Sequence, residues 1–130
     1  MALGFASAEA AKILDCYFNQ GNITAPTAIW MKLHVGDPGS AGTSNAATET
    51  TRKDVTAVFA AASGGTVTSN VAVSWTTVAG SEDYTHFSIW SASTGGTFYF
   101  SGSITANAVT AGDTFTFASG DIDATISTAA

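Results

Sequence analysis

Residues 84–103, YTHFSIWSASTGGTFYFSGS, decide the fold, because two strand-like runs meet in this stretch across a turn. Both runs alternate from residue to residue, with Phe87 and Ile89 on one face of the first run, which is the pattern of a strand with two different faces. Between the runs lies the pair Gly95-Gly96, which can adopt the positive φ values that hairpin turns need. The stretch predicts a β-hairpin at the middle of the core. The other face of the first run takes Tyr84, His86, Ser88 and Trp90.

The composition predicts one compact domain that is poor in charged residues. The chain has 130 residues, of which 45% are hydrophobic and 11% charged, whereas soluble domains have roughly 25% charged residues. We therefore expect part of the surface to face neighbouring proteins. The net charge of -6 supplies no basic stripe, which argues against nucleic acid and against an anionic membrane as partners. The single cysteine, Cys16, predicts no internal disulfide, and the absence of a long apolar run predicts a soluble chain made in the cytoplasm.

Towards the N-terminus, residues 8–19 predict a short helix that Ser7 caps and Gly21 ends. Its apolar side chains repeat at helical spacing, at Ala10, Ile13, Leu14, Tyr17 and Phe18. Such a helix either plugs one end of a β-sandwich, which is the commoner arrangement, or docks on another subunit.

Strands fill most of the remaining sequence. Residues 28–35 alternate cleanly between apolar and polar side chains, and residues 36–52 then form a long loop of small polar residues, a kind of loop that often makes functional contacts. Further strands are predicted at residues 55–59, 67–75, 104–109, 114–117 and 122–126.

This spacing predicts an all-β fold, an antiparallel β-sandwich or jelly roll with one short N-terminal helix. We expect a single domain over residues 1–130. It divides into a helix and arm at 1–27 and a sandwich at 28–130, with the long loop at 36–52.

Neither histidine predicts a catalytic or metal site. His34 and His86 lie within strands, and no pair of cysteines or histidines has metal-ligand spacing. Ser88 shares a strand face with His86, but it has no nucleophile elbow and no orienting carboxylate. We therefore expect no catalytic residue.

The acidic residues near the C-terminus are the remaining candidates for chemistry. Asp121 and Asp123 share a strand face with Asp113 near them, and paired carboxylates can hold Ca²⁺. A solvated acidic edge that discourages strand aggregation is the commoner arrangement. We expect neither a metal nor another cofactor.

Aromatic residues and two cations are the candidates for contacts with other molecules. Trp30, Trp75 and Trp90 with Tyr84 and Tyr99 can form a sugar-stacking platform, although core packing is the better interpretation for at least two of the three tryptophans. Arg52 and Lys53 can pair with an acidic neighbour on another subunit. The predicted interface residues are Trp30, Asp37, Pro38, Arg52, Lys53 and Tyr84.

The chain resembles a family of small virion structural proteins of tailed actinobacteriophages, often labelled tail fibre or minor structural proteins. The resemblance covers nearly all of the chain after residue 28. It rests on LHVGDPGSAGT at 33–43, RK at 52–53, FAAASGGT at 59–66, SW at 74–75, THFSIW at 85–90, GGT at 95–97 and AGDT at 111–114. Asp54 departs from the small residue expected after Arg52-Lys53. The resemblance implies a virion component and brings no catalytic residues.

From these observations we expect a non-enzymatic bacteriophage structural protein, a decoration or cement protein on the outside of the capsid. Its partners would be the major capsid protein or other virion proteins, and it would form a homo-oligomer, with a trimer as one arrangement. The loop at 36–52 or the N-terminal helix would reach across the subunit boundary. The alternative is a tail fibre or spike module that binds host surface glycan through exposed Trp and Tyr side chains.

Overall fold

The computed structural model describes residues 3–129, and over that range the chain forms one helix and nine strands. In chain order they are β1 (Gly4–Phe5), α1 (Ser7–Phe18), β2 (Trp30–His34), β3 (Lys53–Asp54), β4 (Thr66–Thr68), β5 (Val73–Trp75), β6 (Glu82–Trp90), β7 (Phe98–Val109), β8 (Phe115–Phe117) and β9 (Asp123–Thr125). Among these residues, no helix is long and apolar enough to span a membrane.

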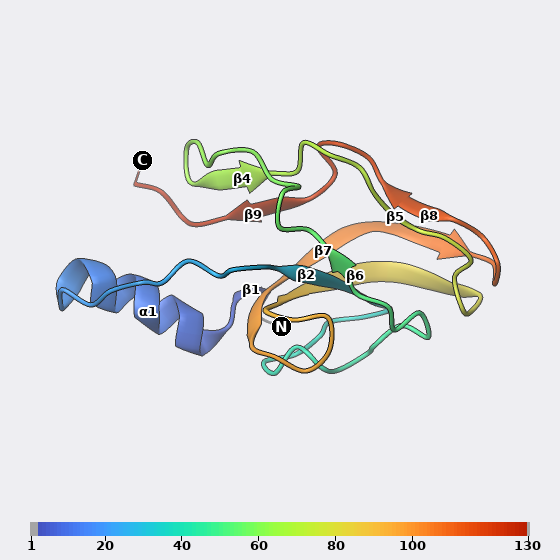
Figure 1. Ribbon diagram of the computed structural model, residues 1–130, viewed down its shortest axis with the longest axis horizontal. Coiled ribbons are helices and arrows are strands. Elements are labelled where there is room, and N and C mark those ends of the chain that lie inside the picture. The colour runs from blue at the N-terminus through green and yellow to red at the C-terminus, as the bar shows by residue number, and fades with distance from the viewer. Residues whose placement is uncertain (1–2, 130) are drawn as a thin grey trace.

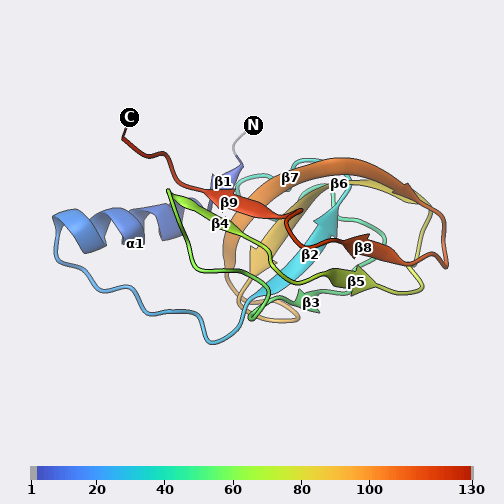
Figure 2. The same ribbon diagram turned by 90° about the horizontal axis from the view of Figure 1, so that it is seen from above.

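The strands pair antiparallel and form two layers (Figure 1). Within residues 3–129, one layer is a five-stranded sheet in the order β1-β7-β6-β2-β3, and the other consists of the two-stranded sheets β4-β9 and β5-β8. Figure 2 shows these two small sheets next to each other over the large one. The predicted antiparallel all-β sandwich with one short N-terminal helix is confirmed, whereas its jelly-roll form stays a prediction.

The hairpin that the sequence predicts is the centre of the large sheet. Strands β6 and β7 pair from Trp90 with Phe98 to Glu82 with Val109. The turn takes its shape from glycine, because Gly95 and Gly96 have φ values of 59° and 76°. The segment 104–109, expected as a separate short strand, is the continuation of β7.

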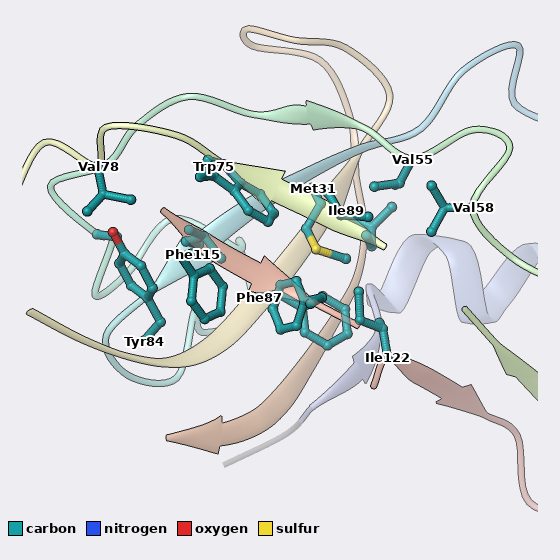
Figure 3. Packing of buried hydrophobic residues seen from close by; sticks show 14 of the residues in the cluster. Met31, Val55, Val58, Trp75, Val78, Tyr84, Phe87, Ile89, Phe115 and Ile122 are labelled. Carbon is teal, nitrogen blue, oxygen red and sulfur yellow. The ribbon is translucent and has the colours of Figure 1, made fainter. Parts of the chain in front are cut away.

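Buried apolar side chains fill the space between the two layers (Figure 3). The prediction that Tyr84 and His86 share a strand face is wrong. A register shift between these two residues turns the strand, so that Tyr84 and Phe87, three residues apart, both lie in the core. The ring of Tyr84 meets that of Phe115 edge to face with centroids 4.9 Å apart.

Two predicted strands are wrong in extent. Residues 55–59 form a turn closed by the Val58 N–H on the Val55 carbonyl, and only Phe59 makes a β-bridge, to Ser69. Residues 67–75 divide into β4 and β5, which belong to different sheets. Between them the Asn70 N–H donates to the Val58 carbonyl, so the chain changes partners there instead of continuing one strand.

The helix forms where predicted, but its ends are built differently. Its N-cap is Ala6, which makes no side-chain hydrogen bond, so Ser7 is not the cap. At the other end Gln20 adopts the left-handed conformation with φ 57°, and the Gly21 N–H donates to the Asp15 carbonyl at 2.9 Å. Gly21 therefore closes the helix with its N–H, while Gln20 supplies the positive φ.

The loop at 36–52 covers the outer face of the large sheet, the face turned away from the two small sheets. Pro38, Gly42 and Ala47 are buried in it, and Ala46 bridges to His34. At Gly42 a Cβ would lie 2.6 Å from the ring of Phe98, and its φ is 71°. The loop is thus packed on its own domain, and a contact of this loop across a subunit boundary stays a prediction.

Candidate functional site

A chain of hydrogen bonds crosses the outer face of the large sheet beneath the 36–52 loop. His34 Nδ1 lies 2.8 Å from the Ser44 carbonyl oxygen, which only accepts, so Nδ1 carries the ring proton. His34 Nε2, 2.7 Å from Ser88 Oγ, then accepts from the hydroxyl. Ser88 Oγ in turn accepts from Trp90 Nε1 at 2.7 Å. Each hydrogen bond of this network therefore has a defined donor and a defined acceptor.

The His34–Ser88 pair has the composition of a catalytic dyad and the surroundings of a structural one. Both side chains are 0% exposed, and the Ser88 hydroxyl is already engaged on both sides. Burial lowers the pKa of His34 despite the hydrogen bond to the Ser44 carbonyl, so the ring is neutral. The pair ties the loop to the sheet.

Sequence reasoning placed Ser88 with His86 because the two share a strand face. In the structure, the pairing of β2 with β6 determines which histidine contacts Ser88. This register places His34 opposite His86 and Lys32 opposite Ser88. The His86 ring bonds instead to Thr85 Oγ1, at 2.8 Å from Nδ1. Periodicity within one strand carries no information on the register with the next, so this pair could not be predicted.

The C-terminal carboxylates each serve a local hydrogen bond. Asp113 accepts from the Thr110 N–H and Asp121 from the Ala118 N–H, both at 2.9 Å, and Asp123 accepts from Thr68 Oγ1 at 2.6 Å. Within residues 3–129, no group of three or more His, Cys, Asp or Glu side chains could hold a metal ion. These carboxylates stabilise turns and a strand pair.

Two glutamates that sequence reasoning missed hold the end of the 36–52 loop. Glu82 accepts from the Thr48 and Glu49 N–H groups at 3.0 and 3.2 Å. Glu49 is itself 7% exposed and accepts from the Ala79 N–H at 3.0 Å. The two carboxylates therefore accept backbone hydrogen bonds that a neighbouring strand would otherwise accept. No motif in the sequence marks them.

Tyr84 lies beside these carboxylates. Its hydroxyl is buried and has no hydrogen-bond partner among the described residues. Burial, with Glu82 and Glu49 nearby, raises its pKa to about 12. The tyrosine therefore stays neutral at any ordinary pH.

The predicted interface residues lie in different environments. Tyr84 and Pro38 are fully buried, so neither presents a side chain to a partner in this structure. Arg52 is engaged within the domain, because its Nη1 donates to the Ala92 and Gly95 carbonyls at 2.8 Å and its guanidinium lies 4.3 Å from the Trp90 ring centroid. Trp30, Asp37 and Lys53 are half-buried. A contact of these residues with another protein stays a prediction.

The tryptophans do not form an exposed platform. Trp75 and Trp90 are 1% and 6% exposed, which agrees with the interpretation that at least two of the three pack in the interior. Trp75 Nε1 also donates to the Thr51 carbonyl at 2.8 Å. The sugar-stacking arrangement therefore lacks most of its members.

The three most exposed of the large apolar side chains lie on the helix. Tyr17 is 82%, Phe18 79% and Leu14 58% exposed, and none of the residues of α1, all of which the structure describes, is buried. Figure 1 shows the helix projecting beyond the end of the sandwich. The prediction that it plugs the sandwich is wrong, because no residue of α1 is buried and only part of the apolar stripe, including Ile13, faces the sheets, while Leu14, Tyr17 and Phe18 are exposed.

A groove of about 590 Å³ separates the helix and its following arm from the sandwich. Its walls are mainly apolar and include Ile13, Ile23, Phe59, Val67 and Ile122. Two charged side chains line it, and they neutralise each other, because Lys12 Nζ lies 2.8 Å from Glu9 Oε1. We call this space the helix groove.

Comparison with known proteins gives one match. No curated protein matches the chain. The family model described as "Podophage GP4 fiber I protein gp80" matches residues 4–125, which includes both the helix and the sandwich. The match confirms a phage structural family, while an actinobacterial host and a place on the capsid stay predictions. The chain belongs to this family of podophage fibre proteins.

Proposed function

We propose that the protein is a non-enzymatic component of a phage tail fibre. The observation that carries the proposal is the match to a podophage fibre family over residues 4–125. It favours the fibre over the capsid decoration that the resemblance first suggested. The proposed role is structural, in that the domain contributes a rigid unit to a larger assembly.

The architecture suits such a unit. Both faces of the large sheet are covered, one by the small sheets and the other by the 36–52 loop. The edge strands of the large sheet, β1 and β3, have two residues each, and short edges discourage strand-to-strand addition. Assembly through side-chain surfaces is therefore favoured over extension of the sheet.

Receptor binding through the predicted aromatic platform is not part of this proposal. Tyr84, Trp75 and Trp90 are buried and cannot stack on a sugar. The two most exposed aromatic rings, those of Tyr17 and Phe18, lie on α1, where they suit contact with another protein.

The decisive experiment measures copy number on purified particles. Quantitative mass spectrometry with the major capsid protein as internal standard should give a few copies per particle, and gold-labelled antibody against the chain should mark the tail. A ratio near one copy per capsid subunit, with gold over the head, would overturn the fibre proposal and restore the decoration protein.

A further inference from the structure

The starting observation is the exposed stripe on α1. At 3.6 residues per turn, Leu14, Tyr17 and Phe18 fall within an arc of about 100°. This stripe, which we call the helix ridge, faces away from the helix groove, which Glu9 and Ile13 line. The two aromatic rings of the ridge expose roughly 300 Å² between them at their present exposure.

An unpartnered ridge is unusual for a helix of this length. The helix has 12 residues, and isolated helices of 12 to 15 residues are marginal in water. Helices of this size normally owe their stability to an apolar face packed against something else. The ridge is therefore a surface that a partner would cover.

The helix groove, on the same chain, is an open apolar surface that the ridge could fill. Its volume of about 590 Å³ corresponds to roughly 20 water molecules, in walls that are mainly apolar. The charges in it form a neutral pair, Glu9 with Lys12. An uncharged, apolar occupant fits such walls, and the ridge is a surface of that kind.

We propose that the helix ridge of one copy seats in the helix groove of a second copy of this chain. Each molecule carries both halves of the contact. Ridge and groove are both uncharged overall, so the contact places no like charges opposite each other, although the net charge of -6 on each copy opposes association in general. The contact therefore buries no unpaired charge.

The available area is that of a weak single contact. The ridge offers roughly half of the about 800 Å² per partner that a standard interface buries. Because ridge and groove are different surfaces, the contact is heterologous, and each copy can make it twice. A closed ring such as a trimer satisfies every ridge and every groove.

The inference deepens the fibre proposal by naming a partner, and it is tested on the isolated 130-residue chain, so either can fail alone. Analytical ultracentrifugation should show a species whose mass is two or more times the 13.1 kDa of one chain. The double substitution Tyr17→Ser with Phe18→Ser should raise the dissociation constant at least about 100-fold. The substitution Ala124→Glu, which places a carboxylate on the groove wall, should do the same.

The matched control is Val35→Ser with Val71→Ser, two exposed apolar residues outside both surfaces, at 39% and 49% exposure. It should leave the assembly unchanged. Circular dichroism of each variant separates loss of assembly from loss of the fold. A chain that is monomeric at all concentrations, or ridge variants that assemble like the parent, would overturn the proposal.

Crosslinking identifies where the ridge sits. With the photoreactive substitution Tyr17→p-benzoylphenylalanine, and a mixture of isotope-labelled and unlabelled chains, crosslinks between copies should map to residues 59–67 or 122–124. Crosslinks to α1 of the other copy would show helix-to-helix pairing and overturn the groove as the seat.

Discussion

At the scale of single residues, His34 has the most consequences. It lies on β2, bonds to Ser88 on β6 and to Ser44 in the loop, and so connects three parts of the chain that are far apart in sequence. The sequence shows that His34 lies in a strand. Its partners depend on the register between strands and on the path of the loop, neither of which strand periodicity encodes.

The lowered pKa of His34 predicts a loss of stability in mild acid. Below about pH 6.5, the ordinary value for the side chain, the unfolded chain takes up a proton that the folded chain still refuses. The stabilising contribution is therefore complete above pH 6.5 and is lost as the pH falls through the lowered pKa. Urea unfolding between pH 5 and 8 measures the effect.

The control for this titration uses substitution. His34→Asn keeps a donor for the Ser44 carbonyl, but it leaves Ser88 without its acceptor, so it should cost about 1–3 kcal/mol at pH 7 and flatten the pH dependence. His86→Asn should leave the pH dependence in place. If the His86 variant flattened the pH dependence and the His34 variant did not, the assignment of the effect to His34 would be contradicted.

Tyr84 supplies a second prediction, in which the substitution does not destabilise the fold and the pH-dependent loss of stability occurs at high pH. Since its buried hydroxyl has no partner among the described residues, Tyr84→Phe should leave the free energy of unfolding unchanged or raise it by up to about 1 kcal/mol. The parent should also lose stability between pH 10 and about 12, where only the unfolded chain ionises, and the variant should lose less. A loss of more than 2 kcal/mol at neutral pH would mean that the hydroxyl has a partner, such as a buried water.

At the scale of elements, the sequence predicted best where the pattern is local. The hairpin of β6 and β7 and the helix α1 follow from alternation, helical spacing and a Gly-Gly turn, all of which are readable within 20 residues. The alternation of residues 67–75 predicts one strand because it continues through Val71 and Val73. The break between β4 and β5 depends on hydrogen bonds to Val58 and Ile122, which lie far away in sequence.

The glutamates at the end of the 36–52 loop allow a test at this scale. Glu82→Gln replaces an acceptor by an amide group that clashes with one of the two N–H donors, so amide exchange at Thr48 and Glu49 should accelerate at least about tenfold. Asp83→Asn, at the neighbouring exposed position, is the matched control. Unchanged protection at Thr48 in the Glu82 variant would show that the carboxylate does not hold the loop.

At the scale of the whole molecule, we expect the sandwich and the helix to contribute separately to stability, because no residue of α1 is buried. Composition predicted a surface that faces neighbours, and the helix was one of its two candidate locations. The sequence did not reveal whether the apolar stripe would cover the sandwich or face outwards, because helical periodicity is the same in both cases. The helix is attached at both ends, through β1 and through the arm that leads to β2, and helical periodicity encodes neither attachment.

A comparison of substitutions checks this separation. Tyr17→Ser with Phe18→Ser should change the free energy of unfolding of the dilute monomer by less than about 0.5 kcal/mol, because both rings are largely exposed and serine has a similar helix propensity. Ile122→Ser, in the core, should cost about 2–5 kcal/mol. A ridge variant that destabilises the monomer as much as the core variant would mean that the ridge packs within its own chain.

The attachment of α1 to the sandwich determines how the domain would carry mechanical load. Before the helix, β1 pairs with β7 through Gly4 and Phe5, and the Ala6 N–H donates to the Tyr99 carbonyl. After it, the arm enters β2, which pairs with the other hairpin strand, β6. A force applied to the helix therefore divides between both strands of the central hairpin: it reaches β7 directly through β1, and it reaches β6 through the arm and β2.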